Sequence, residues 1–145
     1  MTKDTIEQFF KRYERFFMQS LNGEIDGNEI SELYAKEFIA ASPVGVLTGK
    51  NDSSMQQALA QGYEQYPRIG TKEMHIRGIN ISPIDEFHCV SHVAWTAVYA
   101  SDDKPETEID FDVHYLIQEL NGKPRIFGWI SRNEQELLRQ YGIIS

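Results

Sequence analysis

The sequence predicts a single α+β domain in which three N-terminal helices pack on a strongly curved antiparallel sheet and a short C-terminal helix follows. Apolar residues recur at helical spacing up to Gly70 and at a spacing of two from Lys72 onward. Helices followed by a run of strands, with no βαβ repeat and no nucleotide-binding glycine pattern, are typical of α+β folds. The 145 residues suffice for one core, so one domain is expected over 1–145.

The first two predicted helices occupy the N-terminal quarter of the chain. In the first, Thr5 and Gln8 match a capping box and Gly23 ends the run. The second is shorter and begins at Asp26 or Asn28, either of which can cap it. The apolar residues of the first helix fall at helical spacing and define its buried face: Ile6, Phe9, Phe10, Tyr13, Phe16, Phe17 and Leu21.

A short strand and a third helix are predicted before the sheet. Residues 38–42 read as a strand that Pro43 ends, and the glycines within 45–49 indicate a loop. The third helix is expected to open within 51–54 and to stop at Pro67, which disfavours helical backbone at the residue before it.

Four long strands are predicted in the second half of the chain. Asn121-Gly122 indicates a hairpin turn, and Asn133 with Glu136 caps the last helix. Strands much longer than the usual ~5–6 residues twist strongly, so the sheet should curl around the helices and leave a hollow for a small molecule. The strands are expected at 72–81, 87–99, 108–120 and 125–131.

Composition excludes several classes of function. A net charge of −8 repels phosphate backbones and anionic lipid, so nucleic acid and membrane surfaces are not expected as partners. No leader segment or membrane span is recognisable, and the chain is expected in the cytoplasm. The single cysteine, Cys89, lies in an apolar strand without a second thiol and reads as a small buried hydrophobe.

The end of the chain resembles the C-terminus of SnoaL-like proteins in the NTF2-like superfamily. The resemblance rests on an aromatic strand end followed by a capped helix, GWISRN at 128–133 and ELLRQYG at 136–142. It implies a cone-shaped fold around a pocket, whose convex sheet face commonly packs on a second subunit, so a homodimer is expected. Activity does not follow, because this scaffold carries polyketide cyclases, ketosteroid isomerases, dehydratases and plain binding modules.

Two family positions lack the acid or base that the chemistry uses. The element Ser42-Pro43-Val44-Gly45 looks like the Asp-Pro-Val-Gly of ketosteroid isomerases, but Ser42 stands where their general base would be. A serine hydroxyl without an adjacent base cannot accept a proton at neutral pH, which disfavours that mechanism. The acid of polyketide cyclases falls at Ile130 or Ser131 here, and neither transfers protons.

His114 and Asp112 are the candidate catalytic pair. Strand geometry places both on one face with Asp110, while Phe111, Val113 and Tyr115 occupy the other. From the pattern alone the polar face could simply meet water. The resemblance implies instead that His114 is a pocket residue supported by Asp112, with the apolar stripe at the subunit contact. No further ligand at metal-binding spacing accompanies them, so no metal or other cofactor is expected.

Four other residues are candidate ligand contacts: Tyr13, Phe17, Ser42 and Trp129. The resemblance implies that Tyr13 lies near the position of a tyrosine that polarises the substrate carbonyl. Two functions remain open at this stage. One is an enzyme that acts on a small, largely apolar carbonyl compound, and the other is a non-catalytic binding or dimerisation module that retains the cone.

Overall fold

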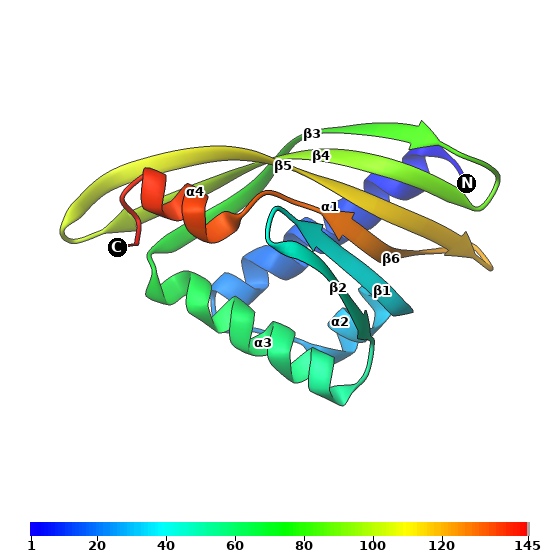
Figure 1. Cartoon of the computed structure of the whole chain (residues 1–145), viewed down its shortest axis with the longest axis horizontal. Helices are drawn as coiled ribbons and strands as arrows, with labels where there is room; N and C mark the ends of the chain where they lie inside the picture. The colour runs from blue at the N-terminus through cyan, green and yellow to red at the C-terminus, as the bar shows by residue number, and fades with distance from the viewer. Residues whose placement is uncertain (145) are drawn as a thin grey trace.

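The computed structural model describes residues 1–144 and shows the α+β fold of helices against a long, bent sheet (Figure 1). A short C-terminal helix follows the last strand, as the sequence predicts. In chain order the elements are α1 (Lys3–Leu21), α2 (Gly27–Leu33), β1 (Tyr34–Ser42), β2 (Gly45–Lys50), α3 (Ser53–Arg68), β3 (Thr71–Pro83), β4 (His88–Ser101), β5 (Lys104–Leu120), β6 (Lys123–Ile130) and α4 (Glu134–Gln140).

The sheet is mixed, whereas the sequence predicted an antiparallel one. Its strand order is β2-β1-β6-β5-β4-β3, and β1 runs parallel to β6 while all other neighbours are antiparallel. The parallel pair was missed because the hydrophobic pattern of a short strand says nothing about a partner that lies so far along the chain. The consecutive strands β3 to β6 form the predicted meander.

The predicted loop at 45–49 is wrong, because these residues belong to strand β2. Gly45 turns the chain with a φ of 137°, and β2 then pairs back along β1. Gly49 faces Phe38 across this hairpin, and a Cβ atom there would lie 2.5 Å from the Phe38 ring. The glycine therefore makes room for an aromatic ring on the neighbouring strand, although glycine in sequence usually suggests a turn.

Helix α1 begins three residues earlier than a cap at Thr5 predicts, and it buries the predicted face except at Leu21, which is half-buried. Thr2 is the N-cap, and its side chain accepts a hydrogen bond from the backbone N–H of Thr5, so the Thr5–Gln8 capping box is not formed. The apolar residues from Ile6 to Phe17 at helical spacing are all buried. α1 runs beneath the sheet and contacts β3 and α3 (Figure 1).

The two faces of the curved sheet differ in polarity. On β5, Ile109, Val113 and Tyr115 are buried on the concave side, and Asp110, Asp112 and His114 alternate with them on the exposed convex side. The concave side faces α1, whose surface is aromatic; for example, the rings of Phe10 and Tyr115 lie 5.1 Å apart. The polar residues of β5 face outward because the space between sheet and helix is filled by apolar side chains.

We expect Gly128→Val to destabilise the fold through overpacking. A Cβ atom at Gly128 would lie 2.9 Å from Cγ1 of Ile39, 2.9 Å from Cδ1 of Leu116 and 3.2 Å from the Ile39 carbonyl oxygen. The branched side chain adds two more atoms there, so the free energy of unfolding in urea should fall by about 1–3 kcal/mol.

Gly62→Ala is the matched control for that variant. Gly62 lies inside α3, and a Cβ atom there would meet nothing within 4 Å. Its replacement by alanine should raise the free energy of unfolding by about 0.5–1 kcal/mol. Equal stability of Gly128→Val and the wild type would show that the β1–β6–β5 contact at Gly128 is looser than the structure indicates.

Candidate functional site

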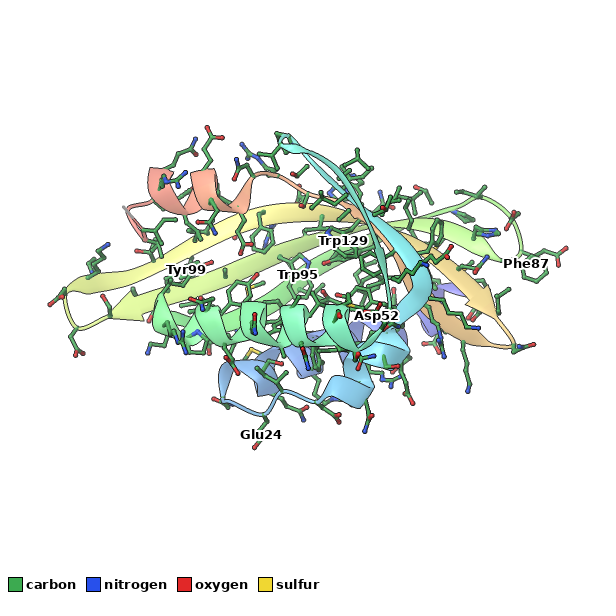
Figure 2. The ribbon with its side chains drawn as sticks, turned by 60° about the horizontal axis from the view of Figure 1, so that its bottom comes forward. Glu24, Asp52, Phe87, Trp95, Tyr99 and Trp129 are labelled. Atoms are coloured by element: carbon green, nitrogen blue, oxygen red, sulfur yellow. The ribbon has the colours of Figure 1, made fainter. Side chains whose placement is uncertain are left out.

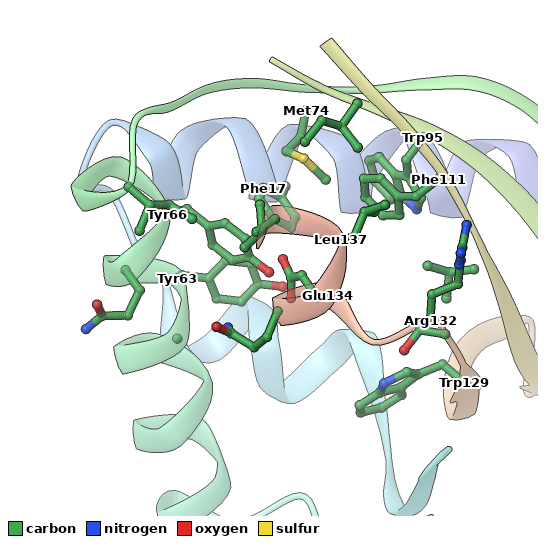
Figure 3. A pocket seen from close by; sticks show the side chains of 18 of the residues that line it. Phe17, Tyr63, Tyr66, Met74, Trp95, Phe111, Trp129, Arg132, Glu134 and Leu137 are labelled. Atoms are coloured by element: carbon green, nitrogen blue, oxygen red, sulfur yellow. The ribbon is translucent and has the colours of Figure 1, made fainter. Parts of the chain in front are cut away.

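An aromatic cavity of about 520 Å³ lies between the concave face of the sheet and helices α1, α3 and α4 (Figure 3). Both tryptophans of the chain, Trp95 and Trp129, contribute to its wall. The described lining also contains six of the seven tyrosines: Tyr13, Tyr34, Tyr63, Tyr66, Tyr99 and Tyr115. This volume is typical of sites that enclose a small organic molecule.

Helix periodicity brings the aromatic wall together. Tyr13 and Phe17 lie one turn apart on α1, and Tyr63 and Tyr66 lie at i and i+3 on α3, so each pair shares a helix face. The two helices meet through these rings, since the Phe17 centroid lies 5.0 Å from that of Tyr63 and 5.1 Å from that of Tyr66. The wall is therefore packed and largely preformed.

Phenol hydroxyls gather at the buried end of the cavity. The hydroxyls of Tyr13 and Tyr34 lie 3.1 Å apart, and the indole N–H of Trp95 donates a hydrogen bond of 3.2 Å to the Tyr115 hydroxyl. Burial raises the pKa of Tyr34, Tyr63 and Tyr115 well above the ordinary phenol value. These side chains consequently stay protonated at neutral pH and can act as hydrogen-bond donors.

Glu134 contributes a carboxylate to the cavity lining. Asn133 accepts a hydrogen bond from the backbone N–H of Glu136, as predicted, so α4 begins at Glu134. Part of Glu134 is exposed, but its carboxylate points toward Tyr63 and Tyr66 of α3 (Figure 3). Burial raises the pKa of Glu134, and this effect outweighs that of the nearby Tyr66 phenol, which lowers the pKa.

Three of the four predicted ligand contacts lie in the cavity wall, namely Tyr13, Phe17 and Trp129. Ser42 is not part of the wall. It ends β1, and its hydroxyl accepts a hydrogen bond of 3.3 Å from the backbone N–H of Val44. The structure therefore gives Ser42 a role in the turn between β1 and β2.

The candidate pair His114 and Asp112 lies on the convex face, outside the cavity. His114 is exposed and stacks on His92 with ring centroids 4.3 Å apart. Asp112 lies 3.3 Å from Nε2 of His92 and 3.7 Å from the guanidinium of Arg77. The expected orientation of this strand is wrong, and a catalytic role of the pair at the cavity finds no geometric support.

The apolar residues of β5 also lie on a different surface from the one predicted. Phe111, Val113 and Tyr115 were expected at a subunit contact, but all three line the cavity. The physical reason is that the concave face must cover the aromatic surface of α1, which only the apolar side of β5 can do without burying carboxylates. The predicted homodimer would have to use other residues of the convex face.

The sequence matches a family described as NTF2-like protein (DUF6841) over residues 3–134. The chain belongs to this NTF2-like family. The narrower SnoaL-like assignment stays a prediction. No curated protein sequence matches the chain significantly.

Solved structures of NTF2-like proteins share the fold. The chain resembles an NTF2-like protein with a cystatin-like fold from Novosphingobium aromaticivorans at 12% identity and a TM-score of 0.67, covering 99% of this chain and 88% of that one. An NTF2-like protein of unknown function from Shewanella oneidensis has 15% identity and a TM-score of 0.65, with 92% and 100% covered. A candidate scytalone dehydratase from Novosphingobium aromaticivorans has 15% identity and a TM-score of 0.64, with 88% and 80% covered. At such identities the likeness shows the fold alone.

Within residues 1–144, no helix of this NTF2-like chain is long and apolar enough to cross a membrane. Within the same residues, no three His, Cys, Asp or Glu side chains lie close enough together to hold a metal ion.

Sequence reasoning missed Tyr63, Tyr66 and Glu134 of the cavity. The i, i+3 spacing of the two tyrosines was a usable signal, because both rings had to share the face of α3 that meets α1. Glu134 had no comparable signal. Its position after a helix cap fits an ordinary solvent-exposed first turn, and the local sequence does not show that its carboxylate lines the cavity.

We expect Glu134→Gln to gain stability relative to the wild type as pH rises. Because the folded state raises the pKa of Glu134, the wild type is most stable when this group is protonated and loses stability as pH rises through the folded pKa. Glutamine has no such titration. The difference in unfolding free energy, variant minus wild type, should be larger at about pH 8 than at about pH 4 in urea titrations.

Glu136→Gln serves as the control, since Glu136 lies on the same helix outside the cavity wall. If both glutamine variants showed the same dependence on pH, the carboxylate of Glu134 would be solvated like a surface group.

Proposed function

We propose that this NTF2-like chain is a SnoaL-like protein that binds a small, largely apolar carbonyl compound in its cone-shaped cavity. The observation that supports this best is the group of buried phenols in an otherwise apolar cavity. An apolar wall with a few convergent polar groups is typical of small-molecule sites.

A carbonyl oxygen is the group that fits the buried end. Tyr13, Tyr34 and Tyr115 present hydroxyls there, and a phenol hydroxyl donates to an acceptor without introducing a charge. In surroundings of low dielectric constant such a hydrogen bond strengthens, and it strengthens further if negative charge develops on the oxygen. An anionic ligand is disfavoured because the chain carries a net charge of −8.

The apolar part of the ligand fits the remainder of the wall. Trp95, Trp129 and Phe111 provide flat surfaces, and Met74 and Leu137 add flexible aliphatic contacts (Figure 3). A cavity of about 520 Å³ takes a molecule of roughly two or three rings.

Acid/base chemistry of the isomerase, cyclase or dehydratase type is a second candidate function. It needs a proton acceptor at the ligand, and Glu134 supplies the one Asp or Glu side chain within the described wall. The alternative is a binding module without catalysis, in which Glu134 only contributes to recognition. Conversion of a bound ketone into an isomer would favour the enzyme, and unchanged recovery of every bound compound would favour the module.

We expect a naphthyl ketone to bind more tightly than its hydrocarbon counterpart. The two tryptophans of the chain both line the cavity, so their fluorescence reports occupancy directly. In titrations, 2-acetylnaphthalene should bind about 2- to 10-fold more tightly than 2-ethylnaphthalene, which is the range one neutral hydrogen bond provides.

Tyr13→Phe should remove most of this preference while leaving the affinity for 2-ethylnaphthalene nearly unchanged. His114→Ala is the control, because His114 lies on the convex face, and it should bind both compounds like the wild type. Loss of ketone affinity in His114→Ala, with Tyr13→Phe unaffected, would overturn the proposed site and revive the sequence prediction for His114.

A further inference from the structure

The carboxylate of Glu134 has acceptor capacity that the protein leaves unused. A carboxylate has about four lone-pair sites, and within residues 1–144 no side chain lies within direct hydrogen-bond distance of the Glu134 carboxylate; Tyr66 is the nearby phenol that affects its pKa. Within residues 1–144 no Lys, Arg or His forms an ion pair with Glu134, although Arg132 also borders the cavity. The remaining lone pairs on the cavity side are available to a ligand.

Two elements bring titratable groups to Glu134. Tyr66 comes from α3 and Tyr99 from β4, whereas Arg132 borders the cavity from the segment that leads into α4. Burial is the main cause of the raised pKa of Tyr66 and Tyr99, and the charge of Glu134 is the second cause. The pKa of Tyr99 is raised to about 12. Both phenols therefore stay neutral across the physiological range, which leaves the carboxylate as the group that titrates toward the cavity.

From this geometry we infer that Glu134 and Tyr66 form a subsite that selects a ligand bearing a hydroxyl group in addition to its carbonyl. The hydroxyl donates to the Glu134 carboxylate, and the carbonyl accepts from the buried phenols. The ligand class is thus a ring compound that carries both a ketone and a hydroxyl group. This inference rests on the proposed function, because it assigns the second polar contact of the same cavity.

A hydroxyl fits this subsite better than an ammonium group does. An ammonium ion would have to lose its hydration to enter a cavity that is mostly aromatic, and the cationic Arg132 already borders the same wall. A neutral hydroxyl needs much less desolvation and can donate to the Glu134 carboxylate beside the Tyr66 phenol.

The test compares 6-acetyl-2-naphthol with 2-acetylnaphthalene, using tryptophan fluorescence of the full chain at about pH 7. The wild type should bind the naphthol roughly 10-fold more tightly or better, because hydrogen bonds to charged groups are the stronger ones. Glu134→Gln should lose most of this preference, measured as the ratio of its two affinities. Glu136→Gln should behave like the wild type.

The pH dependence gives a second readout. The affinity of the wild type for the naphthol should rise with pH as Glu134 ionises, while the affinity for 2-acetylnaphthalene should not rise. In Glu134→Gln the naphthol should lose this dependence. Should Glu134→Gln fail to fold, Tyr66→Phe replaces it. This variant should show a smaller preference for the naphthol over 2-acetylnaphthalene, whereas a change in packing alone would weaken the binding of both ligands alike.

Three outcomes would overturn the inference. The first is an equal preference for the naphthol in the wild type and Glu134→Gln, and the second is a wild type that does not distinguish the two ketones. The third is tighter binding of 6-aminomethyl-2-acetylnaphthalene than of 6-acetyl-2-naphthol, which would identify a cation subsite. If neither ketone bound at all, the proposed function itself would fail, so the two failures are distinguishable.

Discussion

The concave face of the sheet has to cover the aromatic surface of α1, and the rest of the structure depends on this contact. Phe10 packs on Tyr115, and both Tyr13 and Phe17 pack on Trp95. Aromatic side chains dominate such interfaces because each buries a large apolar area. The contact decides which side of β4 and β5 turns inward, and it leaves carboxylates and histidines on the convex face. Figure 2 shows Trp95 and Trp129 on the inner side of the sheet, above α3.

The cavity is a direct consequence of the same contact. Rigid rings that meet at an angle do not fill the wide end of a curled sheet, and α3 and α4 close the remaining space with Tyr63, Leu137 and Glu134. Hydroxyls enter the site with the tyrosines that pack it. Tyr13 illustrates the combination, since its ring is part of the core while its hydroxyl lies 3.1 Å from that of Tyr34. Packing and recognition therefore use the same residues.

The helices, the strand meander and the apolar face of α1 could be predicted from local periodicity. The orientation of β5 could not, because Asp112 and Val113 alternate perfectly whichever face turns inward, and the resemblance favoured the wrong one. Strand β2 was missed because Gly49 looks like a turn until Phe38 is seen beside it. For Glu134, the cap motif predicted only where α4 begins. That its side chain shares a cavity with Tyr63 and Tyr66 depends on α3, which lies more than sixty residues earlier in the chain.

The parallel pairing of β1 with β6 has a consequence for how the chain folds. Short connections join the neighbouring strands β3 to β6, whereas the partner of β1 is β6, which lies far along the chain. Such long-range pairing closes a large loop and is slow. We therefore expect the β1–β2 hairpin to dock last, when Phe38 stacks on Trp129 at 5.3 Å. Pulse-labelled hydrogen exchange would show this order as late protection of the β1 and β2 amides. The wall that contains Trp129 would then be completed in the final step of folding.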